Sequence, residues 1–85
     1  ILYPAFDKKG YRYSTGNYPV IRTLRTGEKV FGEEMIMFDS DGKPITLSVT
    51  SAPVMDNQGH MIGVVCAAID ITKKNELLNS LNQAI

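Results

Sequence analysis

The stretch GHMIGVVCAAIDIT, from Gly59 to Thr72, decides the fold of this chain. Residues 61–69 carry no charge and no hydroxyl, and this run is shorter than the roughly 20 apolar residues that span a membrane. Its β-branched residues, and the turn signal at residues 57–59, favour a strand over a buried helix. Successive strand residues point to opposite faces, so an entirely apolar strand predicts cover on both sides. We therefore expect Met61 to Ile69 to form the central strand of a sheet.

The composition indicates one small domain that binds no nucleic acid. The chain has 85 residues, with 9 Lys or Arg against 9 Asp or Glu, and no basic cluster that would attract phosphates. The single cysteine and the lack of a signal-peptide pattern predict a reducing, cytoplasmic location, without membrane contact in this stretch. A parent protein anchored in a membrane elsewhere is compatible with this. The abrupt start at Ile1 and the end inside a helical pattern predict a fragment of a longer protein.

Two more strands are expected before the apolar one. Glu28 to Phe38 is rich in apolar residues, and Pro44 to Met55 alternates apolar and hydroxyl side chains, which is typical of a strand with one buried face. Asp41-Gly42 is a strong hairpin signal, and residues 56–59 form a second turn. The three strands should therefore form an antiparallel meander in a domain of the α+β class.

Two helices are predicted beside the sheet. A short one should begin near Pro19 and end before Gly27, with Arg22 on its solvated side. After Thr72, leucines recur at helical spacing. Apolar residues also recur at intervals of seven, at Ile71, Leu78 and Ile85. This final helix has two alternatives, which are a coiled-coil seam with a partner helix or docking on its own sheet.

The N-terminal segment from Ile1 to Ser14 places aromatic and apolar residues on both sides of a turn signal at residues 7–10. This pattern predicts a short hairpin whose aromatic residues pack at the edge of the core.

Catalytic and metal-binding arrangements are not expected. His60 lies in a turn, and Cys66 lies within the apolar strand, where we expect it to be a small buried side chain. One histidine and one cysteine cannot supply a zinc cage, and phosphate-cradling motifs are absent from the sequence. The chain is therefore predicted not to be an enzyme and to hold no metal.

The order of motifs resembles the C-terminal half of a PAS domain. The matching features are Thr26-Gly27-Glu28, Asp41-Gly42, a strand that ends in Ala52-Pro53-Val54, and Asp70-Ile71-Thr72 before a helix. The resemblance covers residues 18–85. It implies a sensory module of a signal-transduction protein, in which residues 1–72 form the sensor domain and residues 73–85 form a signalling helix. It implies that Asp70, Ile71 and Thr72 act as the hinge that transmits the signal. An output domain, such as a histidine kinase of a two-component system, a cyclase or a DNA-binding transcription regulator, is then expected in the parent protein.

A ligand pocket is expected on the concave face of the sheet. Alternation places apolar residues of the second strand there, the resemblance adds small residues of the last strand, and methionines adapt to irregular volumes. The alternative is that these are ordinary core residues. The candidates are Met35, Met37, Ile45, Leu47, Val49, Ser51, Val64, Cys66 and Ala68. Flavin-binding and haem-binding relatives carry a helical Asn-Cys-Arg-Phe segment or a helical histidine, both missing here, so the cofactor stays unknown and any ligand would be held without a covalent bond.

The N-terminal part departs from the PAS pattern, in which further strands and helices come first. Residues 1–14 are either a reduced version of those strands or the tail of the helical region. If the strands are missing, Met61 to Ile69 becomes a sheet edge with unpaired backbone groups, which proteins avoid. We expect the N-terminal segment, a second copy of the chain or an exchanged strand to cover it, with a homodimer formed through this edge, the final helix or both. The alternative function is a dimerisation or linker module without ligand.

Overall fold

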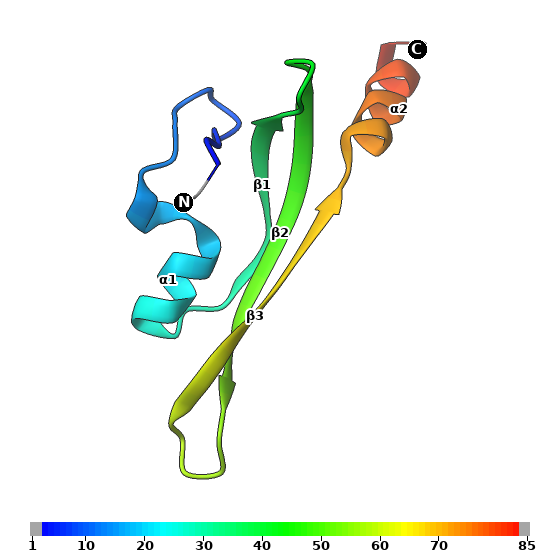
Figure 1. The fold of residues 1–85 in the computed structure, drawn as a ribbon. Coiled ribbons are helices and arrows are strands. Elements are labelled where there is room, and N and C mark those ends of the chain that lie inside the picture. The colour runs from blue at the N-terminus through cyan, green and yellow to red at the C-terminus, as the bar shows by residue number, and fades with distance from the viewer. Residues whose placement is uncertain (1–2, 84–85) are drawn as a thin grey trace.

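The computed structural model describes residues 3–83, and the chain belongs to the α+β class, as predicted (Figure 1). A short 3-10 turn, Thr15–Asn17, precedes the regular elements. In chain order these are α1 (Pro19–Thr26), β1 (Val30–Phe38), β2 (Pro44–Met55), β3 (Met61–Asp70) and α2 (Thr72–Gln83).

The three strands form one antiparallel sheet in the order β1-β2-β3. An aspartate closes each hairpin: Asp39 Oδ1 accepts the amides of Asp41 and Lys43, both at 2.9 Å, and Asp56 Oδ1 accepts those of residues 58 and 60. Gly42, at φ 80°, supplies the left-handed position in the first turn. The predicted meander is therefore confirmed.

The prediction that Met61 to Ile69 is central and covered on both sides is wrong for the described residues. β2 is the central strand, and β3 lies at the edge. Ile62 is 67% exposed and lies on one face of β3, while Val65 and Ile69, at 56% and 64%, lie on the other. An uninterrupted apolar run indicates only that the side chains of a strand favour burial. It does not show which segment covers them.

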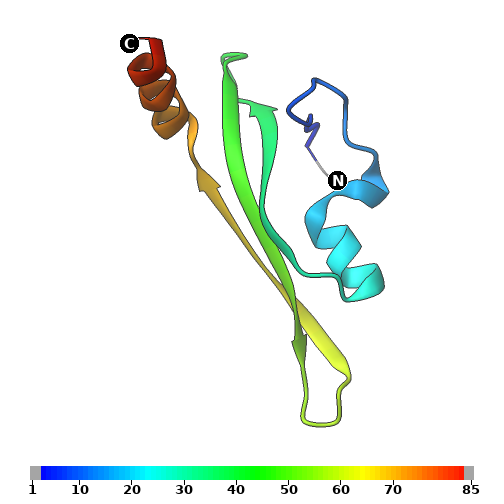
Figure 2. The same ribbon diagram turned by 180° about the vertical axis from the view of Figure 1, so that it is seen from behind.

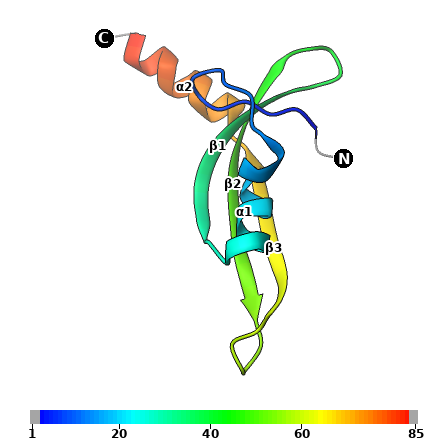
Figure 3. The ribbon, with the colours of Figure 1, turned by 90° about the vertical axis from the view of Figure 1, so that its left-hand side faces the viewer.

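Helix α1 lies in front of the strands when the molecule is viewed from its own side (Figure 3). Pro19 occupies its first turn, and Gly27, at φ 76°, ends it by donating its amide to Thr23 O at 2.8 Å. Thr23 is fully buried and donates its hydroxyl to the Glu28 carbonyl at 2.7 Å. The predicted short helix is confirmed, and on this side of the sheet the core joins Ala5, Tyr18, Met35 and Val49.

The N-terminal segment makes the expected turn, but at the other edge of the sheet. Asp7 N donates to Tyr11 O at 2.8 Å, and Phe6 pairs with Arg12 in a single bridge, which gives a reduced hairpin. Phe6 also exchanges two 2.8 Å backbone hydrogen bonds with Ile36 of β1. The expectation that this segment covers β3 is therefore wrong for residues 3–14, while Ile1 and Leu2 lie outside the described residues.

Helix α2 continues past the end of β3 and stands apart from the sheet, beside the β1–β2 hairpin, as the two opposite views show (Figures 1 and 2). Leu77, Leu78 and Leu81 are 62%, 49% and 64% exposed, so the alternative in which this helix docks on its own sheet is wrong. The coiled-coil alternative stays a prediction, and its Ile85 lies outside the described residues. Neither α1 nor α2 has the length and apolar character that a membrane span requires.

Candidate ligand pocket

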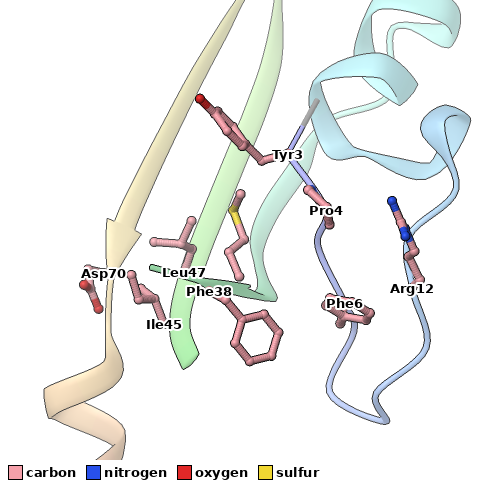
Figure 4. Close-up of a pocket in the computed structure, with 9 residues that line it drawn as sticks. Tyr3, Pro4, Phe6, Arg12, Phe38, Ile45, Leu47 and Asp70 are labelled. Atoms are coloured by element: carbon pink, nitrogen blue, oxygen red, sulfur yellow. The ribbon is translucent and has the colours of Figure 1, made fainter. Parts of the chain in front are cut away.

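A mostly apolar pocket of about 760 Å³ opens between the N-terminal segment and the end of the sheet where β3 meets α2 (Figure 4). Its volume lies in the range of roughly 300 to 1,000 Å³ that is usual for small-molecule sites. The lining combines aliphatic and aromatic side chains with one cation and one carboxylate. The lining residues are Tyr3, Pro4, Phe6, Arg12, Met37, Phe38, Ile45, Leu47 and Asp70.

The N-terminal wall of the pocket is held in place by specific contacts. The rings of Phe6 and Phe38 meet edge to face, with their centroids 5.7 Å apart. Tyr18, from the start of α1, donates its hydroxyl to the Tyr3 carbonyl at 2.6 Å. Together with the Phe6 backbone pairing to β1, these contacts fix a segment that has no regular secondary structure of its own.

The strand wall contains three of the nine predicted pocket residues. Met37 pairs with Ile45, and Met35 pairs with Leu47, and residues directly opposite in an antiparallel pair share a face. Met37, Ile45 and Leu47 line the pocket. Met35 and Val49 are on the same face but are buried in the core, at 4% and 6% exposure.

The other four candidates are on the predicted face but lie away from this pocket. Ser51 pairs with Cys66, and Val49 pairs with Ala68. Ser51 is fully buried, and its Oγ has no hydrogen-bond partner among the described residues. Val64 is half-buried, whereas Cys66 and Ala68 are exposed because nothing described covers this part of β3. The expectation that Cys66 is a buried side chain is therefore wrong.

The pocket adjoins the Asp70-Ile71-Thr72 segment. Thr46 lies between Ile45 and Leu47 on β2, accepts the Ile71 amide at 2.9 Å and donates its own amide to Thr72 Oγ1 at 2.9 Å. These two bonds attach the first residues of α2 to the strand that forms the pocket wall.

Asp70 lines the pocket and also caps α2. Its Oδ1 accepts the Thr72 amide at 2.9 Å, one of the amides that the first helical turn leaves unpaired. Hydrogen bonding by Thr72, through its side chain and its amide, holds the pKa of Asp70 below its usual range. The carboxylate of Asp70 therefore caps this amide, while Thr72 Oγ1 accepts the Thr46 amide of β2.

A polar cluster lies on the other side of the N-terminal segment. Arg22 donates to both carboxylate oxygens of Glu33, at 2.9 and 3.0 Å, and also to Glu28 at 3.0 Å. Tyr13 donates its hydroxyl to Glu33 Oε2 at 2.7 Å. The Arg22 hydrogen bonds lower the pKa of Glu33, while burial and the Glu33 contact raise the pKa of Tyr13. The expectation of a solvated Arg22 is therefore wrong, and the cluster ties α1, β1 and the N-terminal segment together.

Sequence reasoning missed the N-terminal wall of the pocket. The missed residues are Tyr3, Pro4, Phe6 and Arg12, on both sides of the turn signal at residues 7–10. The aromatic and apolar character of the first three was the available clue, and Arg12 offered none. A pattern within one segment does not show which sheet edge that segment joins, so the clue could not place them beside Ile45.

Comparisons with protein-family models, with curated proteins and with solved structures find no match to this chain.

Proposed function

We propose that the chain is a PAS-like sensory module of a larger cytoplasmic signal-transduction protein. In this proposal a small molecule binds beside Ile45 and Leu47, and the signal passes through Asp70, Ile71 and Thr72 into α2. The observation that carries the proposal is the position of Thr46, which lies between two pocket residues and holds the start of α2 by two 2.9 Å hydrogen bonds.

The proposed mechanism is a population shift. A ligand changes an equilibrium only by as much as it binds one state better than the other. A molecule that displaces Ile45 or Leu47 also displaces the Thr46 backbone, and α2 contacts the rest of the described chain chiefly at β2. Since Thr46 and Thr72 share a hydrogen bond, a ligand that moves this end of β2 changes the angle at which α2 leaves the sheet.

The lining of the pocket indicates the kind of ligand. Apolar and aromatic side chains dominate it, with Arg12 and Asp70 as the charged groups. The site therefore suits a mainly apolar molecule, and an anionic group on that molecule could pair with Arg12.

A second candidate function is a dimerisation and linker module without ligand. It is favoured by the exposure of Leu77, Leu78 and Leu81 along α2, because exposed leucines at helical spacing are typical of a partner-binding seam. In both proposals an output domain of the parent protein, such as a kinase, cyclase or DNA-binding module, receives α2.

The experiment uses anilinonaphthalene sulfonate, an apolar anionic dye, as the probe. We expect it to shift the amide resonances of the pocket residues and also those of Thr46, Ile71 and Thr72. Ile45→Trp, which fills the pocket, should weaken these shifts, whereas the control Val54→Trp should preserve them, since Val54 is already 42% exposed near the far end of β2. Dye shifts confined to β3, or shifts at the pocket that leave Thr46 and Thr72 unmoved, would contradict the sensory proposal.

A further inference from the structure

Arg12 is the cation of the ligand pocket, and no carboxylate of the described residues pairs with it. The ion pairs found within residues 3–83 involve other cations. Asp70, the carboxylate of the lining, lies on the opposite wall, at the end of β3 (Figure 4). Its Oδ1 already accepts the Thr72 amide. An anionic group of a ligand is therefore attracted to Arg12 and repelled from the β3 end of the pocket.

The backbone of Arg12 is bonded to the other arm of the N-terminal hairpin. Phe6 pairs with Arg12 in an isolated bridge, and Tyr13 N donates to Ala5 O at 2.8 Å. The Phe6 arm is itself bonded to β1 through its backbone, whereas residues 11–14 have no backbone hydrogen bond to the sheet in the described structure. A short two-stranded hairpin is marginally stable by itself. The position of the Arg12 arm therefore depends on side-chain contacts.

Tyr13 provides the contact that holds this arm. Its hydroxyl donates to Glu33 Oε2 of β1 at 2.7 Å, and its ring packs on Tyr18, with the centroids 5.5 Å apart. Arg22 of α1 donates to both carboxylate oxygens of Glu33, at 2.9 and 3.0 Å, and this bidentate geometry fixes the direction of the carboxylate. The Tyr13 hydroxyl thus joins the Arg12 arm to a carboxylate that α1 and β1 hold in place.

We propose that Arg12 makes the pocket selective for apolar ligands that carry one anionic group, such as a carboxylate or a sulfonate, and that Tyr13 is the positioning residue for Arg12. This inference rests on the proposed function and names the ligand class of the same pocket. A guanidinium pairs with an anion in a directional geometry, whereas apolar contacts are non-directional. Displacement of the Arg12 arm therefore weakens the anionic contact more than the contacts with Ile45 and Leu47.

The first test compares two dyes that differ by one charge. Anilinonaphthalene sulfonate is anionic, and N-phenyl-1-naphthylamine has the same rings without the sulfonate. Their dissociation constants are measured by fluorescence, with Ile45→Trp, which fills the pocket, as the baseline for dye bound elsewhere. Arg12→Gln should raise the dissociation constant of the sulfonate about fivefold and that of the neutral dye by less than about twofold. Arg25→Gln removes the same charge from the last turn of α1, outside the pocket, and should leave both constants unchanged.

The second test separates positioning from general stability. Tyr13→Phe keeps the ring that packs on Tyr18 and removes only the hydroxyl that bonds to Glu33. The sulfonate should bind about threefold more weakly, and the neutral dye should bind as before. Combination with Arg12→Gln should cause no further loss, because the two substitutions act through one contact. The matched control is Tyr11→Phe, on the same arm at a side chain that is 70% exposed, and it should leave both dissociation constants unchanged.

The outcomes separate this inference from the sensory proposal. Equal weakening of both dyes by Tyr13→Phe, or additive losses in the double variant, would overturn the positioning role. Equal losses of sulfonate affinity in Arg12→Gln and Arg25→Gln would overturn the selectivity. Binding that depends on Arg12 but leaves the resonances of Thr46 and Thr72 unmoved would support this inference and contradict the sensory proposal alone. If neither dye binds the pocket, both proposals are wrong.

Discussion

Replacing Thr72 by valine tests the connection between the pocket strand and α2. The substitution keeps the volume and the β-branch of the side chain, and the helix propensities of the two residues are similar. It removes the Oγ1 atom that accepts the Thr46 amide at 2.9 Å in a partly buried position. Because that amide loses its partner, we expect the free energy of unfolding to fall by about 1 to 2 kcal/mol.

The assay is urea unfolding at one fixed protein concentration. With an m-value near 1 kcal/mol/M for a small domain, the midpoint should fall by about 1 to 2 M. Thr72→Ser keeps the hydroxyl and is the matched control, and its midpoint should fall by clearly less. Hydrogen exchange of the Thr46 amide should accelerate in the valine variant alone. Equal destabilisation by valine and serine, or an unchanged Thr46 exchange rate, would refute the reasoning.

Three further predictions concern the supporting structure. Arg22 lowers the pKa of Glu33 in the folded state, so this ion pair stabilises the fold above the ordinary carboxylate value of 4.5, and its contribution is lost as the pH falls through the folded pKa. Glu33→Gln should therefore reduce the loss of unfolding free energy between pH 7 and pH 3, measured by unfolding curves. Ser51→Ala removes a fully buried, unpartnered hydroxyl and should raise the free energy of unfolding by about 0.5 to 1 kcal/mol. A lower free energy of unfolding in this variant would show that the hydroxyl has a partner. Gly27→Ala forces φ 76° on a residue with a Cβ and should cost about 1 kcal/mol, whereas Gly63→Ala, which meets nothing within 4 Å, should cost less in the same thermal melts.

The local elements were predictable because their signals are local. Alternation along Pro44 to Met55 gave the inward face of β2, and the turn aspartates with their glycines gave the two hairpins. Pro19 and Gly27 gave both ends of α1. Alternation placed Ile45 and Leu47 on one face, whereas Met37 was a candidate because methionines adapt to irregular volumes. The register that sets Met37 opposite Ile45 is known only from the structure.

The failures came from contacts between distant segments. The apolar character of β3 is the same whether its neighbours belong to this chain or to another, so the sequence could not show that it is an edge strand. Arg22 could not be assigned a partner without knowing that β1 brings Glu33 within 2.9 Å of it. The N-terminal wall of the pocket was hidden for the same reason, since Phe6 joins β1 rather than β3.

The most direct test of the sensory proposal is the distance between α2 and the sheet, measured by electron paramagnetic resonance. Spin labels at Ser80→Cys and Phe31→Cys in a Cys66→Ala background report it, with unlabelled chain added to suppress signals between copies. We predict that anilinonaphthalene sulfonate shifts the distance distribution, and that Thr72→Val abolishes the shift while the dye still binds. An unchanged distribution with the pocket filled would contradict the account.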